Sequence, residues 1–505
     1  MTAEGGAVPQ SWEDPDPGFA ISLTSAAAWS QLADLYPTES DVLVNCLKTA
    51  RLAGAKAVVV ETRYVDVDYR SEYSAYYSLA FESIKETTHR LHFFDREITD
   101  AQMWDIPDDA VYLGYMILRP RTRGRVGRTM LRPPKGIETA VRTSAEDAIT
   151  LFGQPFTIKA VPFMEQDAHL DRCAHTAVWI AHYSAYLRGE VARRPVAAFS
   201  LLANHALGRG RVVPSDGLTV AQVQDLLRRL DLPPIFHDTS HLPPSIPMPK
   251  GFDPRKHRKE HPGLWDPRII SICCSYLNSG LPVIIGTADH AFVLCGYERK
   301  GPDGHEIRFV RQDDQEGPYR VVEDLFDDKR LADKHPYSPW LSIIVPLPEE
   351  VWVPSERVEY YGKKALRAWA QGWARAAAKD IPDADAYLIA EANDNLAFRT
   401  YVLPTNTFKH QLAGRVDPDV AREYGVARFP RHIWVVEAVS KPARQRGEEK
   451  AVVAEALFDP TSSHLRPMEL AVRIPGLVVV KTTSGTNRLT RCRAEGYRTG
   501  GVGPL

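Results

Sequence analysis

Hydrophobic and polar positions follow two different spacings along the chain, and together they predict an α+β protein. A spacing of three to four residues between apolar positions is typical of helices. It occurs at 41–50, 173–181, 219–230 and 356–379. Short apolar or alternating runs between turn residues are typical of strands. They occur at 57–61, 112–120, 280–286, 290–297, 307–313, 396–403, 433–439 and 451–458.

The chain is long enough for several domains. Its 505 residues exceed one ordinary domain, and 44% hydrophobic with 25% charged residues is ordinary for a globular protein. We predict a mixed α/β N-terminal region at 1–150, a middle region at 151–350 and an α+β C-terminal region at 351–505. The two outer regions are candidate recognition or assembly modules. An insertion rich in proline and histidine at 232–267 is predicted to be a loop that could cover a cleft.

Three reactive side chains stand out in the middle region. Cys173 begins a predicted helix, where unpaired N–H groups and the positive end of the helix dipole stabilise a thiolate. His290 begins a predicted strand, and Asp313 ends the next one. This order of nucleophile, base and orienting carboxylate is typical of a cysteine hydrolase. Asp314 is the alternative acid, because the register that decides between the two carboxylates is not visible in the sequence.

These residues resemble those of a papain-like cysteine peptidase, nearest to the branch of the bacterial double-glycine leader peptidases. The family pattern is a glutamine, a cysteine on a helix, a Pro-Val-Ile strand, a strand that begins with His-Ala, and then Asn or Asp. The matching residues are Gln166, Cys173, Pro282–Ile284, His290–Tyr297 and Asp313. The resemblance covers about 155–347. It implies a core in which the helix with the cysteine packs on an antiparallel sheet that carries the histidine and the aspartate.

The resemblance also implies an oxyanion hole. It would be formed by the Gln166 side chain and the backbone N–H of Cys173. The chain differs from the family at two points here. In the family the glutamine usually stands six residues before the cysteine and a glycine often follows the cysteine, whereas Gln166 stands seven residues before Cys173 and Ala174 follows it.

The implied activity is that of a cysteine peptidase. It would hydrolyse a peptide or isopeptide bond of a dedicated intracellular protein partner through a thioester on Cys173, within a regulatory or defence system of bacteria. Two alternatives stay open, because one fold serves several functions. One is a non-enzymatic papain-fold binding or regulatory protein, and the other is an amidase or acyltransferase with the same fold.

Composition limits the classes of partner and the cellular compartment that we expect for this protein. A net charge of −2 offers no general attraction to nucleic acid or to anionic membranes. The six cysteines are few, lie mostly in apolar segments and lack metal-ligand spacing, so we expect free thiols in a reducing compartment and neither a metal nor a cofactor. Residues 1–16 lack the apolar core of a signal peptide, and no apolar run reaches the roughly 18 residues that span a bilayer. The expected location is cytoplasmic.

Several other patterns have simpler interpretations. An aromatic stretch with interleaved charges at 66–77 is interpreted as packing, and the dense basic cluster at 121–135 as a solvated hairpin rather than a nucleic-acid site. His175 and His182, on the helix of Cys173, are expected to be packing or surface residues. Three polar residues near predicted strand ends in the C-terminal region are interpreted as structural ion pairs or turn residues. They are Arg399, Glu437 and Asp459.

Overall fold

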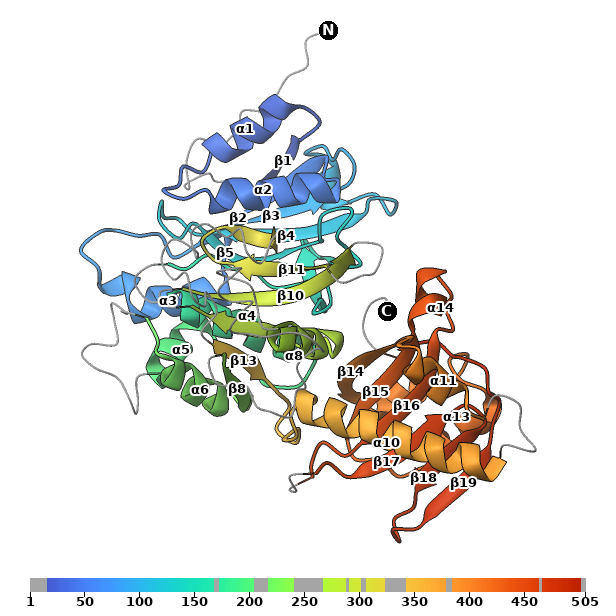
Figure 1. Ribbon diagram of the computed structural model, residues 1–505. Coiled ribbons are helices and arrows are strands. Elements are labelled where there is room, and N and C mark those ends of the chain that lie inside the picture. Colours follow the sequence, from blue (N-terminus) through green and yellow to red (C-terminus); the bar gives the residue numbers. More distant parts are fainter. Residues whose placement is uncertain are drawn as a thin grey trace, which may run out of the picture.

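The protein is an α+β protein with three antiparallel sheets of five or six strands and one separate hairpin (Figure 1). A computed structural model describes residues 16–167, 172–203, 217–239, 267–287, 290–300, 306–322, 342–377, 384–462 and 466–500. The three sheets follow one another along the chain, so each forms from one stretch of sequence. Among these residues, no helix has both the length and the apolar character needed to cross a membrane.

The first sheet has its five strands in chain order. They are β1 (Gly18–Ser22), β2 (Ala57–Tyr64), β3 (Thr88–Phe94), β4 (Tyr112–Leu118) and β5 (Val126–Leu131). Helices α1 (Ala26–Asp34) and α2 (Val42–Ala53) cover one face, where Val58 and Val60 of β2 are buried. Ala57 and Val59 point to the opposite face and pack in the core around helix α4 (Cys173–Leu187). Burial on both faces explains the continuous apolar run that predicted β2.

The second sheet carries the histidine and the aspartate of the sequence pattern. Its order is β12 (Gly317–Val322), β11 (Glu306–Asp313), β10 (Ala291–Lys300), β9 (Val283–Gly286), β13 (Ser342–Pro346) and β8 (Pro234–Asp238). Alternate residues of β10 face opposite sides. Ala291 and Val293 pack toward α4, whereas Phe292 and Leu294 pack toward α8 (Pro267–Asn278). The sheet therefore lies between two helices, and the strands predicted at 280–286, 290–297 and 307–313 are confirmed.

Helix α4 joins the first two sheets in one apolar core. This core contains Tyr115 and Met130 of the first sheet, Val178 of α4 and Val293 of the second sheet. The hairpin β6 (Ala145–Leu151) and β7 (Gln154–Ala160) and the helices α5 (Val196–Ala203) and α6 (Val220–Arg229) contribute to the same core. The predicted boundary near residue 150 thus lies inside a shared core, and the division into three regions stays a prediction.

The C-terminal region is a six-stranded meander covered by a long helix. The strands follow the chain order as β14 (Leu396–Pro404), β15 (His432–Ser440), β16 (Val452–Phe458), β17 (Glu469–Ile474), β18 (Leu477–Lys481) and β19 (Asn487–Arg491). Helix α10 (Ser355–Ala377) packs on one face through Leu366 and Ala370, in a core that also contains residues of α8. Shorter helices complete the region: α11 (Ala386–Ala392), α12 (Thr405–Gln411), α13 (Pro418–Val426) and α14 (Lys441–Gln445). The predicted helix at 356–379 and the strands at 396–403, 433–439 and 451–458 are confirmed.

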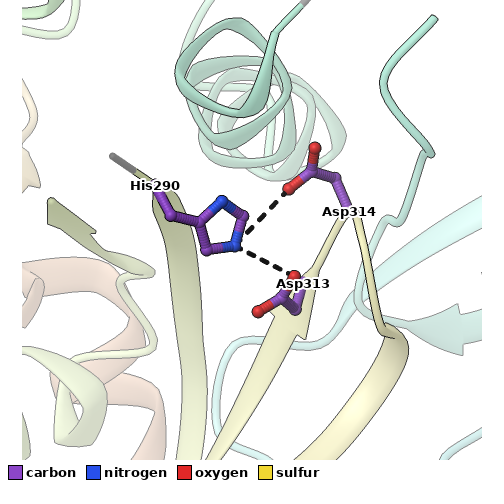
Figure 2. A group of neighbouring side chains, drawn as sticks. All are labelled: His290, Asp313 and Asp314. Atoms are coloured by element: carbon purple, nitrogen blue, oxygen red, sulfur yellow. Dashed lines mark hydrogen bonds and ion pairs between the residues drawn. The ribbon is translucent and has the colours of Figure 1, made fainter. Parts of the chain in front are cut away.

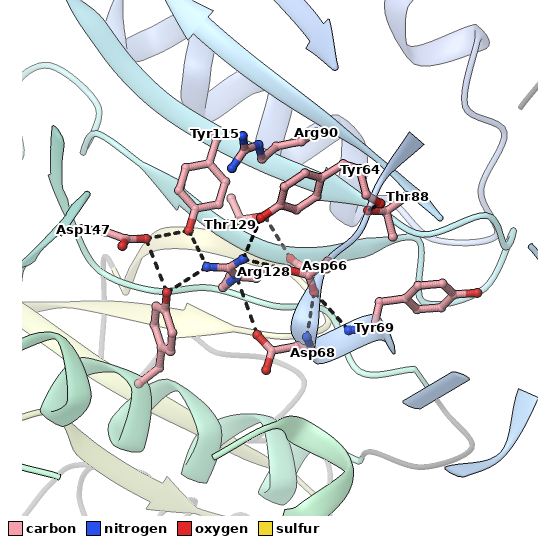
Figure 3. Close-up of polar contacts among 12 residues, drawn as sticks. Tyr64, Asp66, Asp68, Tyr69, Thr88, Arg90, Tyr115, Arg128, Thr129 and Asp147 are labelled. Carbon is pink, nitrogen blue, oxygen red and sulfur yellow. Dashed lines mark hydrogen bonds and ion pairs between the residues drawn. The ribbon is translucent and has the colours of Figure 1, made fainter. Parts of the chain in front are cut away.

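The basic cluster at 121–135 lies along the β4–β5 hairpin, and Arg123, Arg132 and Lys135 are exposed as predicted, but two of its arginines are not solvated. Arg125 and Arg128 are only 3% and 6% exposed. The Arg128 guanidinium pairs with Asp66 at 2.7 Å and with Asp68 at 3.5 Å, both in the segment that begins α3 (Val67–Ala75) (Figure 3). The prediction was wrong for Arg128 because the carboxylates that neutralise it are distant in sequence, and only the tertiary fold brings them to the arginine.

The insertion at 232–267 needs a smaller correction. Its first residues form the edge strand β8, which pairs with β13, so the predicted loop begins later than expected. The rest of this insertion, 240–266, lies outside the described residues. Two other predictions are confirmed. The helix predicted at 219–230 is α6, which Thr219 and Gln222 begin in a capping box, and all six cysteines are free.

Candidate functional site

Cys173 is the first residue of α4. Arg172 is the extended residue before it, and its backbone N–H donates to Nδ1 of His175 at 3.4 Å. The first N–H groups of a helix lack partners within the helix, so the positive end of the dipole lies at the Cys173 sulfur. The side chain is half-buried at the edge of the core around α4. The position matches what the sequence predicted for a nucleophile.

His175 and His182 lie in the same helix but are buried within the protein. Both are 1% exposed. Burial lowers the pKa of each ring to about 4, so both are neutral at physiological pH. They are packing residues, and neither presents a charge to the sulfur.

His290 is held at the start of β10 by two hydrogen bonds with Thr287. Its backbone N–H donates to the Thr287 hydroxyl at 3.1 Å, and the Thr287 N–H donates to the His290 carbonyl at 2.8 Å. These two bonds fix the place where the chain leaves β9 and enters β10. The ring is 16% exposed, so it lies in the protein but remains reachable from solvent.

Asp313 orients the imidazole. β11 pairs with β10, and this pairing places Asp313 beside His290, with 3.1 Å between Asp313 Oδ1 and His290 Nε2 (Figure 2). The backbone N–H of Gln315 donates to the same carboxylate oxygen at 3.1 Å. Arg311 lies 3.5 Å from the other oxygen. The carboxylate is thus fixed from three sides.

Asp314 also faces the ring, but from farther away. Its Oδ1 lies 3.9 Å from His290 Nε2, and no other residue in the described part of the chain donates a hydrogen bond to its carboxylate oxygens. Burial, together with the charge of Asp313, raises the pKa of Asp314 to about 8, although His290 opposes the rise. Burial is the largest influence on the pKa of Asp313 and acts to raise it, but the hydrogen bond and charge of His290, together with Arg311 and the Gln315 N–H, outweigh burial and lower this pKa. Asp313 is therefore the ionised carboxylate, and Asp314 keeps its proton at neutral pH.

The side chains of Cys173 and Asp313 both form hydrogen bonds with His290. Burial lowers the pKa of the imidazole, but the bonds to Asp313 and Cys173 and the charges of Asp313 and Asp314 raise it to about 11. The ring is therefore protonated at neutral pH.

Gln315 is a site residue that sequence reasoning missed. Its side-chain amide nitrogen lies 3.3 Å from Nδ1 of His290, while Nε2 faces Asp313. The signal that could have found it is its place two residues after Asp313, in the turn that ends β11. The reach of its side chain depends on how that turn folds.

Gln166 lies in the segment that precedes α4. Its side chain is half-buried between the buried residues Glu165 and Asp167. Among the contacts of the described residues, none joins the Gln166 side chain to Cys173 or His290. Its role in an oxyanion hole stays a prediction.

One group of side chains in the described part of the chain could hold a metal ion. It consists of His290, Asp313 and Asp314, whose ligand atoms lie within 4.8 Å of one another. A nitrogen and two oxygens of this kind suit a divalent cation. At neutral pH, however, the His290 ring and the Asp314 carboxyl each hold a proton, and a metal would have to displace both.

The three polar residues of the C-terminal region do not form one site. Glu437 is the cross-strand neighbour of both Arg399 and Glu455, and it pairs with Arg415 at 3.6 Å. These side chains are buried, as expected of structural ion pairs. Asp459 lies apart from them, and its carboxylate accepts the N–H of Thr461 in a turn.

The arrangement at His290 can move a proton between a sulfur and a substrate. An imidazole that contacts a thiol at a helix start and an ionised carboxylate has the geometry of a nucleophile with its base and orienting group. No protein-family model matches the chain, and no curated protein matches it either. The assignment of a function therefore depends on this geometry.

Proposed function

We propose that the protein is a papain-like cysteine peptidase that cleaves a peptide or isopeptide bond in a dedicated intracellular protein partner. The observation that carries the proposal is the hydrogen bonding of one imidazole, His290, to both Cys173 and Asp313. The three side chains come from a helix start, a strand start and a strand end. Packing of α4 on β10 holds them together, which pre-organises the site.

The proposed first stage forms a thioester. The Cys173 thiolate attacks the carbonyl carbon, and the oxygen becomes an oxyanion bound by the Cys173 N–H and the Gln166 side chain. As the intermediate collapses, the C–N bond breaks. The His290 imidazolium gives its proton to the leaving amine, and Asp313 keeps the ring in the orientation that this transfer needs.

The second stage releases the acid product. Neutral His290 removes a proton from water while the oxygen of that water attacks the thioester carbonyl. The C–S bond then breaks and restores the thiolate beside a protonated His290. Because the folded site favours a protonated imidazole, it stabilises the state from which each cycle begins.

The substrate assignment rests on the resemblance and on the two flanking regions, which are large enough to recognise a protein. An amidase would use the same two stages on a different amide, and an acyltransferase would use the same first stage with an acceptor other than water. A binding protein would need none of this chemistry. These alternatives give different results in the experiment that follows.

The test is alkylation with iodoacetamide, with labelled cysteines located by peptide mass spectrometry. Cys492 is the matched internal control, since it and Cys173 are the two half-buried thiols in the described part of the chain. We expect rapid labelling of Cys173 alone, and its loss in His290→Ala. Equal labelling of Cys173 and Cys492 would contradict the proposal. A comparison of new protein N-termini in cells with wild type and with Cys173→Ala would separate peptidase from the other acyl-transfer activities.

A further inference from the structure

Two segments of the N-terminal region meet next to Gln166. Tyr77 ends the aromatic stretch, and Arg121 begins the basic cluster. The Tyr77 hydroxyl donates to the Asp167 carboxylate, and Arg121 donates to the Tyr77 oxygen. The Arg121 guanidinium also lies 3.7 Å from the Asp167 carboxylate and 4.2 Å from the centre of the Tyr77 ring. Asp167 is thus held by a phenol and a guanidinium that come from different parts of the chain.

Glu165, the residue before Gln166, is also held by several hydrogen bonds. The Glu165 carboxylate accepts the Val126 N–H at 2.9 Å and the Ser40 hydroxyl at 2.6 Å. The Glu165 backbone N–H donates to the Val126 carbonyl at 3.0 Å, and Arg119 donates to the Glu165 carbonyl at 3.3 Å. Glu165 is therefore fixed to β5 of the first sheet, and Asp167 to two segments outside the strands of that sheet.

A glycine lets the basic turn pack directly on this segment. Gly124 has a φ of +63°, and a Cβ there would lie 2.7 Å from Asp167 Cα and 2.9 Å from the Gln166 carbonyl oxygen. Any side chain at this position would clash with the backbone of the segment. Backbone thus packs on backbone just where Gln166 and Asp167 join.

The fixed segment lies beside the start of α4. The charge of Asp167 acts on His175, which stands in the first turn of the helix that Cys173 begins. Gln166 is the one residue of 161–167 that is not buried. Its neighbours are thus fixed to the N-terminal region while its own side chain remains available.

We propose that Tyr77, Arg121 and Asp167 are positioning residues that hold Gln166 in the oxyanion hole. This inference rests on the proposed function, and it gives the N-terminal region a part in the reaction. A buried carboxylate cannot leave its donors without a large penalty, so the Asp167 backbone resists displacement. A donor that is fixed before the oxyanion forms stabilises it without reorganisation.

The protonation of Tyr77 agrees with this role. Burial, together with the charges of Asp167 and Glu72, raises the pKa of Tyr77 above its ordinary range, although Arg121 opposes the rise. The hydroxyl therefore stays protonated over the whole physiological pH range, and it donates a hydrogen bond to the Asp167 carboxylate. Tyr77→Phe removes this donor and leaves the buried ring in place, which makes it a mild substitution.

The test compares two reactions of the same sulfur. Alkylation by iodoacetamide forms no oxyanion and reports the nucleophile alone. Acylation by acetyl-glycyl-glycine p-nitrophenyl ester passes through an oxyanion, and its rate is read from the burst of nitrophenolate. We expect Gln166→Ala to lower the acylation rate about a hundredfold and Tyr77→Phe and Asp167→Asn to lower it about tenfold. Alkylation rates and their pH dependence should stay within about twofold of wild type in all three variants.

The matched control is Tyr401→Phe in the C-terminal sheet. Tyr401 is also buried and donates to a buried carboxylate, that of Glu437, at 2.7 Å. This variant should lose stability but keep both reaction rates. Acylation rates that stay at the wild-type value in Tyr77→Phe and Asp167→Asn would overturn the inference. Equal losses in acylation and alkylation would overturn it too, because they would indicate general damage to the site. If wild-type Cys173 is not selectively alkylated, the proposed function itself fails.

Discussion

The second and third sheets both bury carboxylates, but the two groups of charges are satisfied differently. In the C-terminal sheet, Glu437 accepts hydrogen bonds from Tyr401, Thr499 and the Gly500 N–H. Just after β11 of the second sheet, Asp314 accepts no hydrogen bond from any other described residue. A carboxylate with a full set of donors stabilises a fold, whereas a buried carboxyl without donors beside a titratable ring is typical of a chemical site.

The largest effect should come from removal of the nucleophile or the base. Cys173→Ala and His290→Ala should each lower the rate of ester hydrolysis by about 10⁴-fold or more, because the two side chains act as one unit. Glu437→Gln in the other sheet should leave the rate unchanged once it is normalised to the folded fraction. Steady-state rates of the three variants provide the measurement. A rate loss in Glu437→Gln as large as that in His290→Ala would remove the distinction between the two sheets.

A second substitution pair separates the two adjacent acids. Asp313→Asn should lower the hydrolysis rate about 10³- to 10⁴-fold, since the ring loses the carboxylate that orients it and stabilises its charge. Asp314→Asn should cost less than about tenfold, because the Asp314 carboxyl lies 3.9 Å from the ring nitrogen and keeps its proton. Rate profiles against pH for both variants provide the readout. The reverse order of effects would identify Asp314 as the orienting acid.

Stability should respond most strongly in the C-terminal sheet. Glu437→Ala leaves Arg415 with one partner fewer inside the protein, so it should lower the free energy of unfolding by about 3–5 kcal/mol. Asp314→Ala removes a carboxyl that accepts no hydrogen bond from any other described residue, and it should cost less. Urea denaturation of both variants makes the comparison. Equal losses would mean that Asp314 has structural partners comparable with those of Glu437.

The smallest expected effect is a dependence of stability on pH. The pKa of Asp314 is raised to about 8 by burial and by Asp313. The folded protein therefore binds a proton that the unfolded chain loses near pH 4, and this contribution to stability falls as pH rises from about 4 to about 8. Asp314→Asn lacks this pH-dependent contribution. Its free energy of unfolding, relative to that of wild type, should therefore increase by up to a few kcal/mol as the pH rises from about 4 to about 8. Urea denaturation at several pH values measures the difference. A constant difference would indicate an ionised Asp314.

Short-range patterns in the sequence predicted most of the secondary structure. The continuous run of β2, the alternation around His290 and the spacing in α10 each reflect burial, which local sequence records. The helix start at Cys173 followed from the same reasoning. The prediction for the basic cluster failed because it depended on contacts between residues distant in sequence. The partners of Arg128 are Asp66 and Asp68, and no local pattern connects them.

The sequence alone determined which side chains could react and on which kinds of element they lie. It named Cys173, His290 and Asp313, with Asp314 as the alternative acid, because residue types and the ends of predicted elements can be read directly from the sequence. Only the tertiary structure decided the rest. It placed Asp313 closer than Asp314 to the ring, brought Gln315 to the other ring nitrogen and joined Tyr77 to Asp167. Each of these depends on strand register, turn geometry or contacts between distant segments, and such features arise only when the chain packs.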